Sequence, residues 1–241
     1  MFDFKFFLLT FLKCLKAVPV TLLITFLSLL LSVLPAFFIA YGRIKEHKAG
    51  SFISKIYVSF MRGTPMVLQI LIVYSLMPGL LNSFFKGIHS SVNVFDLNPL
   101  WYAFLVFTLN TAAVMSEAFR SALLSVSKGQ YEAALCVGMS PFNAWTRILI
   151  PQAFYSALPN LCNLTVILIK NTSLSFMMTV KDITAVAKIE GSFGFNYIEA
   201  YSDIFFIYLI VCLLVQWIYT LLERKFDFMG IETDKKAFSV S

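Results

Sequence analysis

Residues 129–154 read GQYEAALCVGMSPFNAWTRILIPQAF, a partly polar segment that lies between two long apolar stretches of the chain. Such a segment is unexpected because its surroundings are very hydrophobic. Of the 241 residues, 59% are hydrophobic and 13% are charged. A soluble domain carries about 25% charged residues. The composition therefore excludes an ordinary soluble domain and indicates a membrane protein.

Five uncharged runs are long enough to cross a bilayer, which takes about 20 apolar residues in a helix. The runs cover residues 17–40, 63–85, 97–116, 148–169 and 204–222. One such run can be a buried helix of a soluble protein, but five exceed what a soluble core of this size holds. The expected fold is all-α, a polytopic membrane protein with five transmembrane helices.

The chain divides into three expected parts. Residues 1–16 form a short helix in the membrane interface, because their apolar residues recur at helical spacing and their lysines lie mostly off that stripe. Residues 17–226 form the transmembrane domain, with spans at 17–40, 63–85, 97–116, 150–175 and 204–222 and a structured loop at 128–149. Residues 227–241 form a cytoplasmic tail. No metal site is expected, since the four cysteines are scattered and the two histidines stand alone.

The basic residues predict the orientation, because lysine and arginine accumulate on the cytoplasmic side. One side, including the flanks of the first inner loop, carries Arg43, Lys45, Lys48, Lys55, Arg62, Arg120, Lys128, Arg147, Arg224, Lys225, Lys235 and Lys236. The opposite side carries Lys5, Lys13, Lys16, Lys86, Lys181 and Lys188. We therefore expect the N-terminus outside and the C-terminus in the cytoplasm, although the N-terminal lysines act against this orientation.

The opening segment would then be a cytoplasmic loop made of two short helices. Good helix formers follow Gln130, Gly138 ends that helix, and Ser140 with Pro141 begins a second one that runs to Pro151. A plain connector between two helices needs only about 2–8 residues. A longer, structured loop indicates a docking surface, with small residues at Ala133 and Ala134 and a charge at Glu132.

The same segment resembles the EAA loop of ABC-importer permeases. The match consists of Glu132-Ala133-Ala134, Gly138 and Ile150-Pro151. Arg62-Gly63-Thr64-Pro65 with Gln69 resembles an element of the polar amino acid permeases, as do several later segments: Glu117–Arg120, Ser125-Val126, Gly129-Gln130, Pro151–Ala153, Pro159-Asn160 and Lys170–Leu174. The resemblance covers residues 19–223 and implies the type I importer fold, in which this loop forms coupling helices. The implied ATPase-coupling residues are Gln130, Glu132, Ala133, Ala134, Gly138, Met139 and Ser140.

The resemblance also implies partners. They are a dimer of ATPase subunits, a second permease chain identical or paralogous to this one, and an extracellular or periplasmic binding protein. This chain has no phosphate-binding loop of the G-x-x-x-x-G-K-[ST] type, so ATP and Mg²⁺ would bind to the partner ATPase. No cofactor and no nucleic acid are expected on this chain, which would be a non-catalytic subunit in the lipid membrane.

Polar residues inside the apolar spans are candidates for the substrate pathway, because they are costly in a membrane. The candidates are Gln69, Asn110, Asn163, Lys170, Asn171, Thr172 and Ser173, and a gating or packing role is expected for Arg62, Gly63, Thr64 and Pro65. Each has a plainer alternative. Gln69 and Asn110 can bond between helices, Lys170 can reach the interface, and 62–65 can simply start a helix. Glu117 can pair with Arg120, three residues later.

The most specific expectation is an ATP-driven permease for a polar amino acid. Residues 172–176 and the segment that follows them resemble cystine-type permeases, which favours L-cystine. The spans hold few acidic residues, and this argues mildly against a cationic substrate. Two alternatives remain: a secondary transporter driven by an ion gradient, which would need inverted repeats and embedded acids, and a membrane-embedded enzyme, for which no catalytic set is found.

Overall fold

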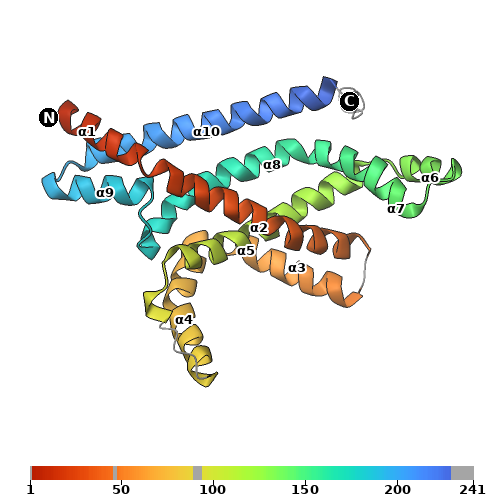
Figure 1. Ribbon diagram of the computed structural model, residues 1–241, viewed down its shortest axis with the longest axis horizontal. Helices are drawn as coiled ribbons and strands as arrows, with labels where there is room; N and C mark the ends of the chain where they lie inside the picture. The colour runs from red at the N-terminus through yellow and green to blue at the C-terminus, as the bar shows by residue number, and fades with distance from the viewer. Residues whose placement is uncertain (1, 46–47, 89–93, 229–241) are drawn as a thin grey trace.

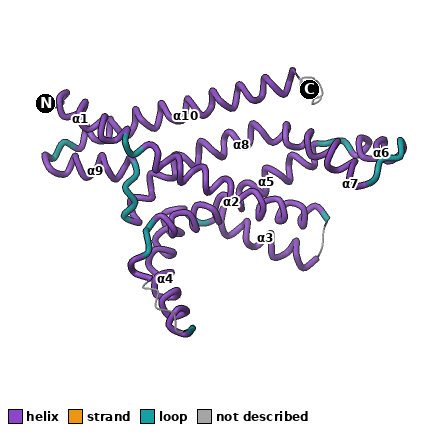
Figure 2. Tube along the Cα trace, viewed as in Figure 1, coloured by secondary structure: helices purple, strands orange, loops and turns teal. Residues whose placement is uncertain are grey.

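The computed structural model describes residues 2–45, 48–88 and 94–228, and within these ranges every regular element is a helix (Figures 1 and 2). The longer helices are α1 (Phe4–Leu15), α2 (Val18–Ile44), α3 (Lys48–Gly63), α4 (Met66–Gly87), α5 (Leu100–Ser125), α6 (Lys128–Cys136), α8 (Ile150–Thr172), α9 (Ile183–Gly194) and α10 (Tyr197–Phe228). The short ones are η1 (Val94–Asp96), α7 (Pro141–Ala144), the π-turn η2 (Trp145–Leu149) and η3 (Ser173–Met178).

Five helical stretches are long and apolar enough to span a membrane, as predicted. They are Phe4–Ile44, Met66–Gly87, Leu100–Ser125, Pro141–Met178 and Tyr197–Lys225. Most of these helices are longer than the uncharged runs. Hydropathy identifies the residues that suit the hydrocarbon core of the bilayer, but a helix can continue past them into polar residues. The tail at 229–241 lies outside the described residues.

Two helices were not predicted, and one predicted helix end was wrong. The loop after the first span is largely helix α3, and the connection before the fifth span contains helix α9. Both carry charged residues that interrupt the apolar runs. The second short helix of the 128–149 loop does not end at Pro151, because α7, η2 and α8 follow one another without a break. Pro151 lies in the first turn of α8, where a missing N–H group costs little.

Helices α2, α5 and α8 pack together along the length of the molecule, while α4 projects away from them (Figure 1). Their buried side chains include Ile24, Phe107 and Leu168, which lie in one cluster with Ile70 of α4. Small buried residues let these helices approach closely. The three long helices thus form the frame on which the loops are mounted.

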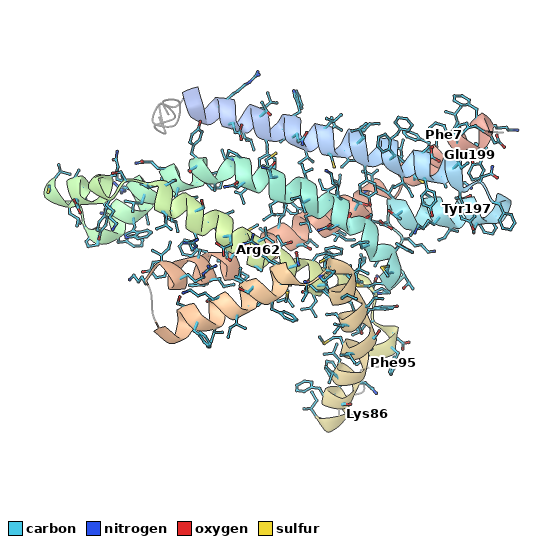
Figure 3. All side chains as sticks on the ribbon, turned by 180° about the vertical axis from the view of Figure 1, so that it is seen from behind. Phe7, Arg62, Lys86, Phe95, Tyr197 and Glu199 are labelled. Carbon is cyan, nitrogen blue, oxygen red and sulfur yellow. The ribbon has the colours of Figure 1, made fainter. Side chains whose placement is uncertain are left out.

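The N-terminal helix α1 packs against α9 and α10. The Asp3 backbone N–H donates to Glu199 Oε1 at 2.7 Å, Lys13 pairs with Glu190 at 2.7 Å, and the rings of Phe7 and Phe206 meet edge-on. Figure 3 shows Phe7 and Glu199 at this end of the molecule. The placement of residues 1–16 in the membrane interface stays a prediction, but the helix is held by protein contacts.

The loop regions gather at two ends of the molecule. The turn between α6 and α7 and the C-terminal ends of α2 and α10 lie toward one end, and α1 and α9 lie toward the other (Figure 1). Of the six basic residues predicted outside, Lys5, Lys13, Lys16, Lys181 and Lys188 lie in or next to α1 and α9, and Lys86 lies at the tip of α4 (Figure 3). We refer to the end with the α6–α7 turn as the coupling-loop end.

Candidate functional site

The loop at 128–149 protrudes at the coupling-loop end as two short helices joined by a sharp bend (Figure 1). Ser127 and Ser140 cap the two helices, since the Oγ of each accepts a backbone N–H, from Gly129 and Asn143 respectively, at 3.3 Å. Gly138 has φ of 83°, a left-handed conformation that suits glycine. The first predicted helix, the start of the second at Ser140 and the bend at Gly138 are confirmed, whereas the second helix continues into α8.

The exposed surface of this loop is partly apolar. Glu132 and Ala133 are exposed, whereas Ala134 is 6% exposed and packs inside the loop. Only one of the two alanines therefore offers a small outer surface. Val137 is 79% exposed and Phe142 is 75% exposed. Of the other expected coupling residues, Gln130, Gly138 and Ser140 are exposed and Met139 is half-buried. Val137 lies outside the candidate spans, and Phe142 is the second residue of the stretch Pro141–Met178. These two exposed apolar side chains near a carboxylate make a surface suited to protein docking.

A charged cluster around Glu117 connects α2, α3 and α5. The Glu117 carboxylate accepts a hydrogen bond from Arg43 and another from Arg120 Nε at 3.3 Å, and Arg62 lies 3.9 Å away. These groups, apart from Arg120, line a cavity of about 380 Å³ together with Lys55. The pair of Glu117 and Arg120 is present, but Arg43 is the partner that the sequence did not reveal. Arg62 lies near the middle of the molecule (Figure 3).

The break between α3 and α4 is held by Gln69 and Asn110. Gln69 Nε2 donates to the Thr64 Oγ1 at 2.7 Å and to the Met61 carbonyl at 2.9 Å. Asn110 Nδ2 of α5 donates to Gln69 Oε1 at 3.0 Å. Thr64 and Pro65 form the break itself, after Arg62 and Gly63 at the end of α3, and the break lets α4 leave in a new direction. Gln69 and Asn110 thus bond between elements, the plainer alternative, and their place in a substrate pathway stays a prediction.

Helix α8 carries a polar stripe on one exposed face. Asn160, Asn163 and Lys170 are exposed and lie three and seven residues apart, which places them on one side of a helix. Among the described residues, no carboxylate lies within ion-pair distance of Lys170. Asn171 and Ser173 are half-buried, while Thr172 is buried and its hydroxyl donates to the Ile169 carbonyl at 2.6 Å. The expected pathway residues of α8 therefore do not share one face.

The sequence matches a family described as the binding-protein-dependent transport system inner membrane component over residues 32–228. This range includes the loop at 128–149, the cluster around Glu117, the break between α3 and α4, and the polar stripe of α8. The chain belongs to this family.

The relatives of this permease include amino acid transport proteins. It is 34% identical to the L-cystine transport system permease protein TcyL of Bacillus subtilis over 86% of this chain and 84% of that protein. It is 35% identical to the octopine transport system permease protein OccM of Rhizobium radiobacter over 92% of this chain and 89% of that protein. The permease is thus a multi-pass membrane protein of the amino acid ABC transporter class.

Solved structures agree on the fold. A crystal structure of an amino acid ABC transporter with histidines superposes with a TM-score of 0.71 at 28% identity, over 89% of this chain and 98% of that chain. The MetNI methionine ABC transporter, in inward-facing conformations, gives a TM-score of 0.69 at 18% identity over 88% of this chain and 95% of that chain. The permease has the type I importer fold. Family membership favours ATP-driven import over the ion-gradient alternative.

Sequence reasoning on this permease missed three side chains that the structure places at its sites. Arg43 binds Glu117 from α2, and Val137 and Phe142 form the apolar surface of the coupling loop. Arg43 and Glu117 are 74 positions apart in the sequence, so no local pattern could reveal that they form a pair. The sequence did contain a signal for Phe142. This aromatic residue directly follows the helix-start pair Ser140-Pro141, and it lies outside the apolar runs that form the spans.

Proposed function

We propose that this permease is the membrane-spanning subunit of an ABC importer that carries a polar amino acid, with L-cystine favoured, into the cell. A separate ATPase dimer binds ATP and Mg²⁺ and docks on the α6–α7 loop. A second permease chain completes the pathway, and an extracellular or periplasmic binding protein delivers the substrate. The N-terminus lies outside, and the coupling-loop end lies in the cytoplasm.

The observation that carries the proposal is the shape and surface of the α6–α7 loop. It protrudes at the coupling-loop end (Figure 1), is capped at both helices and exposes Val137 and Phe142. Exposed aromatic side chains are frequent anchors of protein interfaces. Glu132 is exposed on α6, the first of the two helices, and supplies a negative charge for a hydrogen-bond donor on the ATPase.

Docking is tested with Phe142→Ala and Glu132→Lys in the complete importer. We expect each variant to reach the membrane at normal abundance, because both side chains are exposed and belong to none of the buried clusters of the helix frame. Loss of an anchoring aromatic residue or of one member of a charge pair costs about 2 kcal/mol or more of binding, so co-purification of the ATPase and uptake both fall at least about tenfold.

The matched control is Phe84→Ala on α4, which truncates a phenylalanine that is 62% exposed away from the loop. It should retain the ATPase. Normal ATPase binding and uptake in both loop variants would show that the loop is only a connector.

The substrate assignment is supported by the charges along the spans. Helices α2, α4 and α8 contain no aspartate or glutamate, whereas α5 contains Glu117 and α10 contains Glu199 and Asp203. On α8, Lys170 lies two turns from Asn163 on the same exposed face. A lysine without a carboxylate partner suits the α-carboxylate of an amino acid, of which L-cystine has two. The name of the relative TcyL adds to this preference, although OccM is named for octopine.

The substrate is tested by uptake of labelled L-cystine in vesicles that hold the complete reconstituted importer. Unlabelled L-cystine should compete, and L-arginine should not. Lys170→Gln should lower uptake about tenfold or more while the ATPase stays bound, whereas Lys181→Gln, an exposed lysine outside the spans, should leave uptake unchanged. Competition by arginine together with failure of cystine to compete would overturn the assignment.

A further inference from the structure

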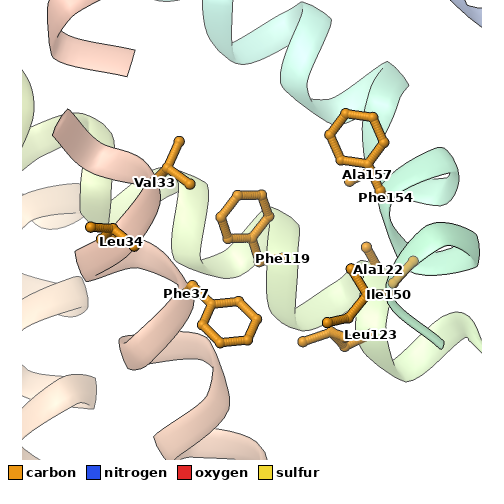
Figure 4. Close-up of a pocket in the computed structure, with 10 residues that line it drawn as sticks. Val33, Leu34, Phe37, Phe119, Ala122, Leu123, Ile150, Phe154 and Ala157 are labelled. Atoms are coloured by element: carbon orange, nitrogen blue, oxygen red, sulfur yellow. The ribbon is translucent and has the colours of Figure 1, made fainter. Parts of the chain in front are cut away.

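An apolar crevice lies between α2, α5 and α8 and has a volume of about 210 Å³ (Figure 4). Its lining consists only of hydrocarbon side chains, from Val33, Leu34, Phe37, Phe119, Ala122, Leu123, Ile150, Ala153, Phe154 and Ala157. We call this feature the apolar crevice. It belongs to the sides of the spans and shares no residue with the charged cavity around Glu117.

The crevice exists because small and large residues alternate around it. Ala122 of α5 packs against Ala153 and Ala157 of α8, which brings these two helices close together. Phe37 of α2 and Phe119 of α5 stand around the remaining space (Figure 4). Leu34 at the rim is 68% exposed, so the crevice opens sideways from the helix frame. In a membrane-spanning region, this opening faces the acyl chains of the bilayer or another protein.

One end of the crevice leads to an aromatic pair and a cation. Tyr41 lies one turn after Phe37 on α2, and the two rings stack with their centroids 6.2 Å apart. The Tyr41 ring also meets the Trp145 ring edge-on at 6.0 Å. Lys45 follows another turn later, with its Nζ 4.9 Å from the Tyr41 ring centroid. Tyrosine and tryptophan are enriched where hydrocarbon meets the lipid headgroups.

The order along α2 is therefore hydrocarbon lining, then aromatic interface, then positive charge. Lys45 is exposed, and within the described parts of the chain no carboxylate lies in ion-pair range of it. The rise from Phe37 to Lys45 is about 12 Å, which is the scale of the glycerol and phosphate region plus the start of an acyl chain. The arrangement has the polarity of a phospholipid from tail to head.

We propose that the apolar crevice binds one acyl chain of an anionic phospholipid and that Lys45 binds the phosphate group of that lipid. An acyl chain matches a lining without polar atoms, and an anionic headgroup supplies the charge that Lys45 lacks within the described chain. A specific site of this kind should prefer an anionic headgroup to a neutral one, whereas general contact with the bilayer should not. A lysine next to an anionic lipid surface contributes about 1 kcal/mol, which corresponds to about a fivefold preference.

The test uses Trp145 as the reporter. The chain has three tryptophans, and Trp101 and Trp217 are exposed on other helices, so both are replaced by phenylalanine. The full chain is placed in phosphatidylcholine vesicles that contain a small fraction of lipid brominated on its acyl chains. Brominated phosphatidylglycerol should quench Trp145 fluorescence at about one fifth of the concentration that brominated phosphatidylcholine requires.

Matched variants separate the two parts of the site. Lys45→Gln should abolish the headgroup preference, whereas Lys86→Gln, at the tip of α4, should keep it (Figure 3). Val33→Phe fills the crevice and should reduce quenching by both lipids, whereas Leu31→Phe alters an exposed residue of the same helix outside the lining.

Three results would overturn the proposal. Equal quenching by the two lipids in the reporter protein would show ordinary contact with the bilayer. Absence of quenching by either lipid would show that another protein chain, such as a second permease, covers the crevice. An equal loss of preference in Lys45→Gln and Lys86→Gln would show an effect of overall charge.

Discussion

At the residue scale, Asp182 combines a capping role with an electrostatic cost. It lies in the link before α9, fully buried, and its Oδ1 accepts the Ala185 backbone N–H at 2.8 Å. The Tyr208 hydroxyl donates to its Oδ2 at 3.2 Å. Burial raises the pKa of this carboxyl from 3.8 to about 6, and the hydrogen bonds offset only part of that rise. The folded protein therefore holds this proton more tightly than the unfolded chain does.

The pKa of Asp182 predicts how pH affects stability. Between pH 4 and pH 6 the folded state binds more protons than the unfolded state, so the free energy of unfolding falls as pH rises through this window. A shift of about two pKa units corresponds to about 3 kcal/mol. Asp182→Asn keeps the capping oxygen without the charge. We expect its melting temperature in detergent to exceed that of the wild type above pH 6 and to match it near pH 4.

The control for this experiment is Asp3→Asn, which changes another N-cap aspartate at an exposed position. Thermal unfolding would be followed from pH 4 to pH 8 for the three proteins. Parallel melting curves for the wild type and Asp182→Asn across this range would contradict the role assigned to burial of Asp182.

At the element scale, the bend between α6 and α7 depends on one backbone conformation. Gly138 has φ of 83°, and a Cβ added there would meet no atom within 4 Å. Gly138→Ala therefore introduces backbone strain of about 1–2 kcal/mol without a steric clash. We expect the bend to relax, so that less ATPase co-purifies with the permease while its abundance in the membrane stays normal.

Gly129→Ala serves as the matched substitution within the same loop. Its added Cβ would lie 3.5 Å from Ser127 Oγ, an ordinary contact, and its φ does not require glycine. It should retain the ATPase. If Gly138→Ala and Gly129→Ala bind the ATPase equally well, the bend is not what positions the docking surface.

The elements differ in how far the sequence could predict them. The five spans were visible because uncharged runs of that length are rare outside membrane helices. Helices α3 and α9 were missed because Lys55 and Arg62, or Lys188 and Glu190, break the apolar pattern that marks a span. The caps at Ser140 and the bend at Gly138 were predictable, since they depend on local residues. The Arg43–Glu117 pair depends on packing between α2 and α5, which no local pattern contains.

At the scale of the whole molecule, the coupling-loop end and the tip of α4 carry different reporters for the orientation. Cys136 is a natural exposed cysteine on α6, and the exposed Lys86 lies at the tip of α4 (Figure 3). In a protein with Cys14, Cys162 and Cys212 replaced by alanine, Cys136 should react with a membrane-impermeant thiol reagent only after the cells are permeabilised. A cysteine introduced by Lys86→Cys, with Cys136 also replaced, should react in intact cells.

Both measurements follow from the excess of basic residues at the coupling-loop end. Expression of each variant is checked with a detergent-denatured sample, in which every cysteine must react. The reverse labelling pattern would place the coupling loop outside the cell, where no ATPase could reach it, and would remove the basis for the docking proposal.

The unbroken run from α7 through η2 into α8 has a mechanical consequence. Phe142 at one end and Lys170 at the other lie on a single helical rod, and the close packing of Ala153 and Ala157 on Ala122 lies between them. Ala157 is about 22 Å from Phe142 and about 20 Å from Lys170 along such a rod. A displacement of the loop is therefore carried along the helix as far as the alanine contact. Beyond it, Pro159 interrupts the helical hydrogen bonds, and the buried Leu164, Leu168 and Ile169 pack against other helices, so the position of Lys170 is set by the helix frame.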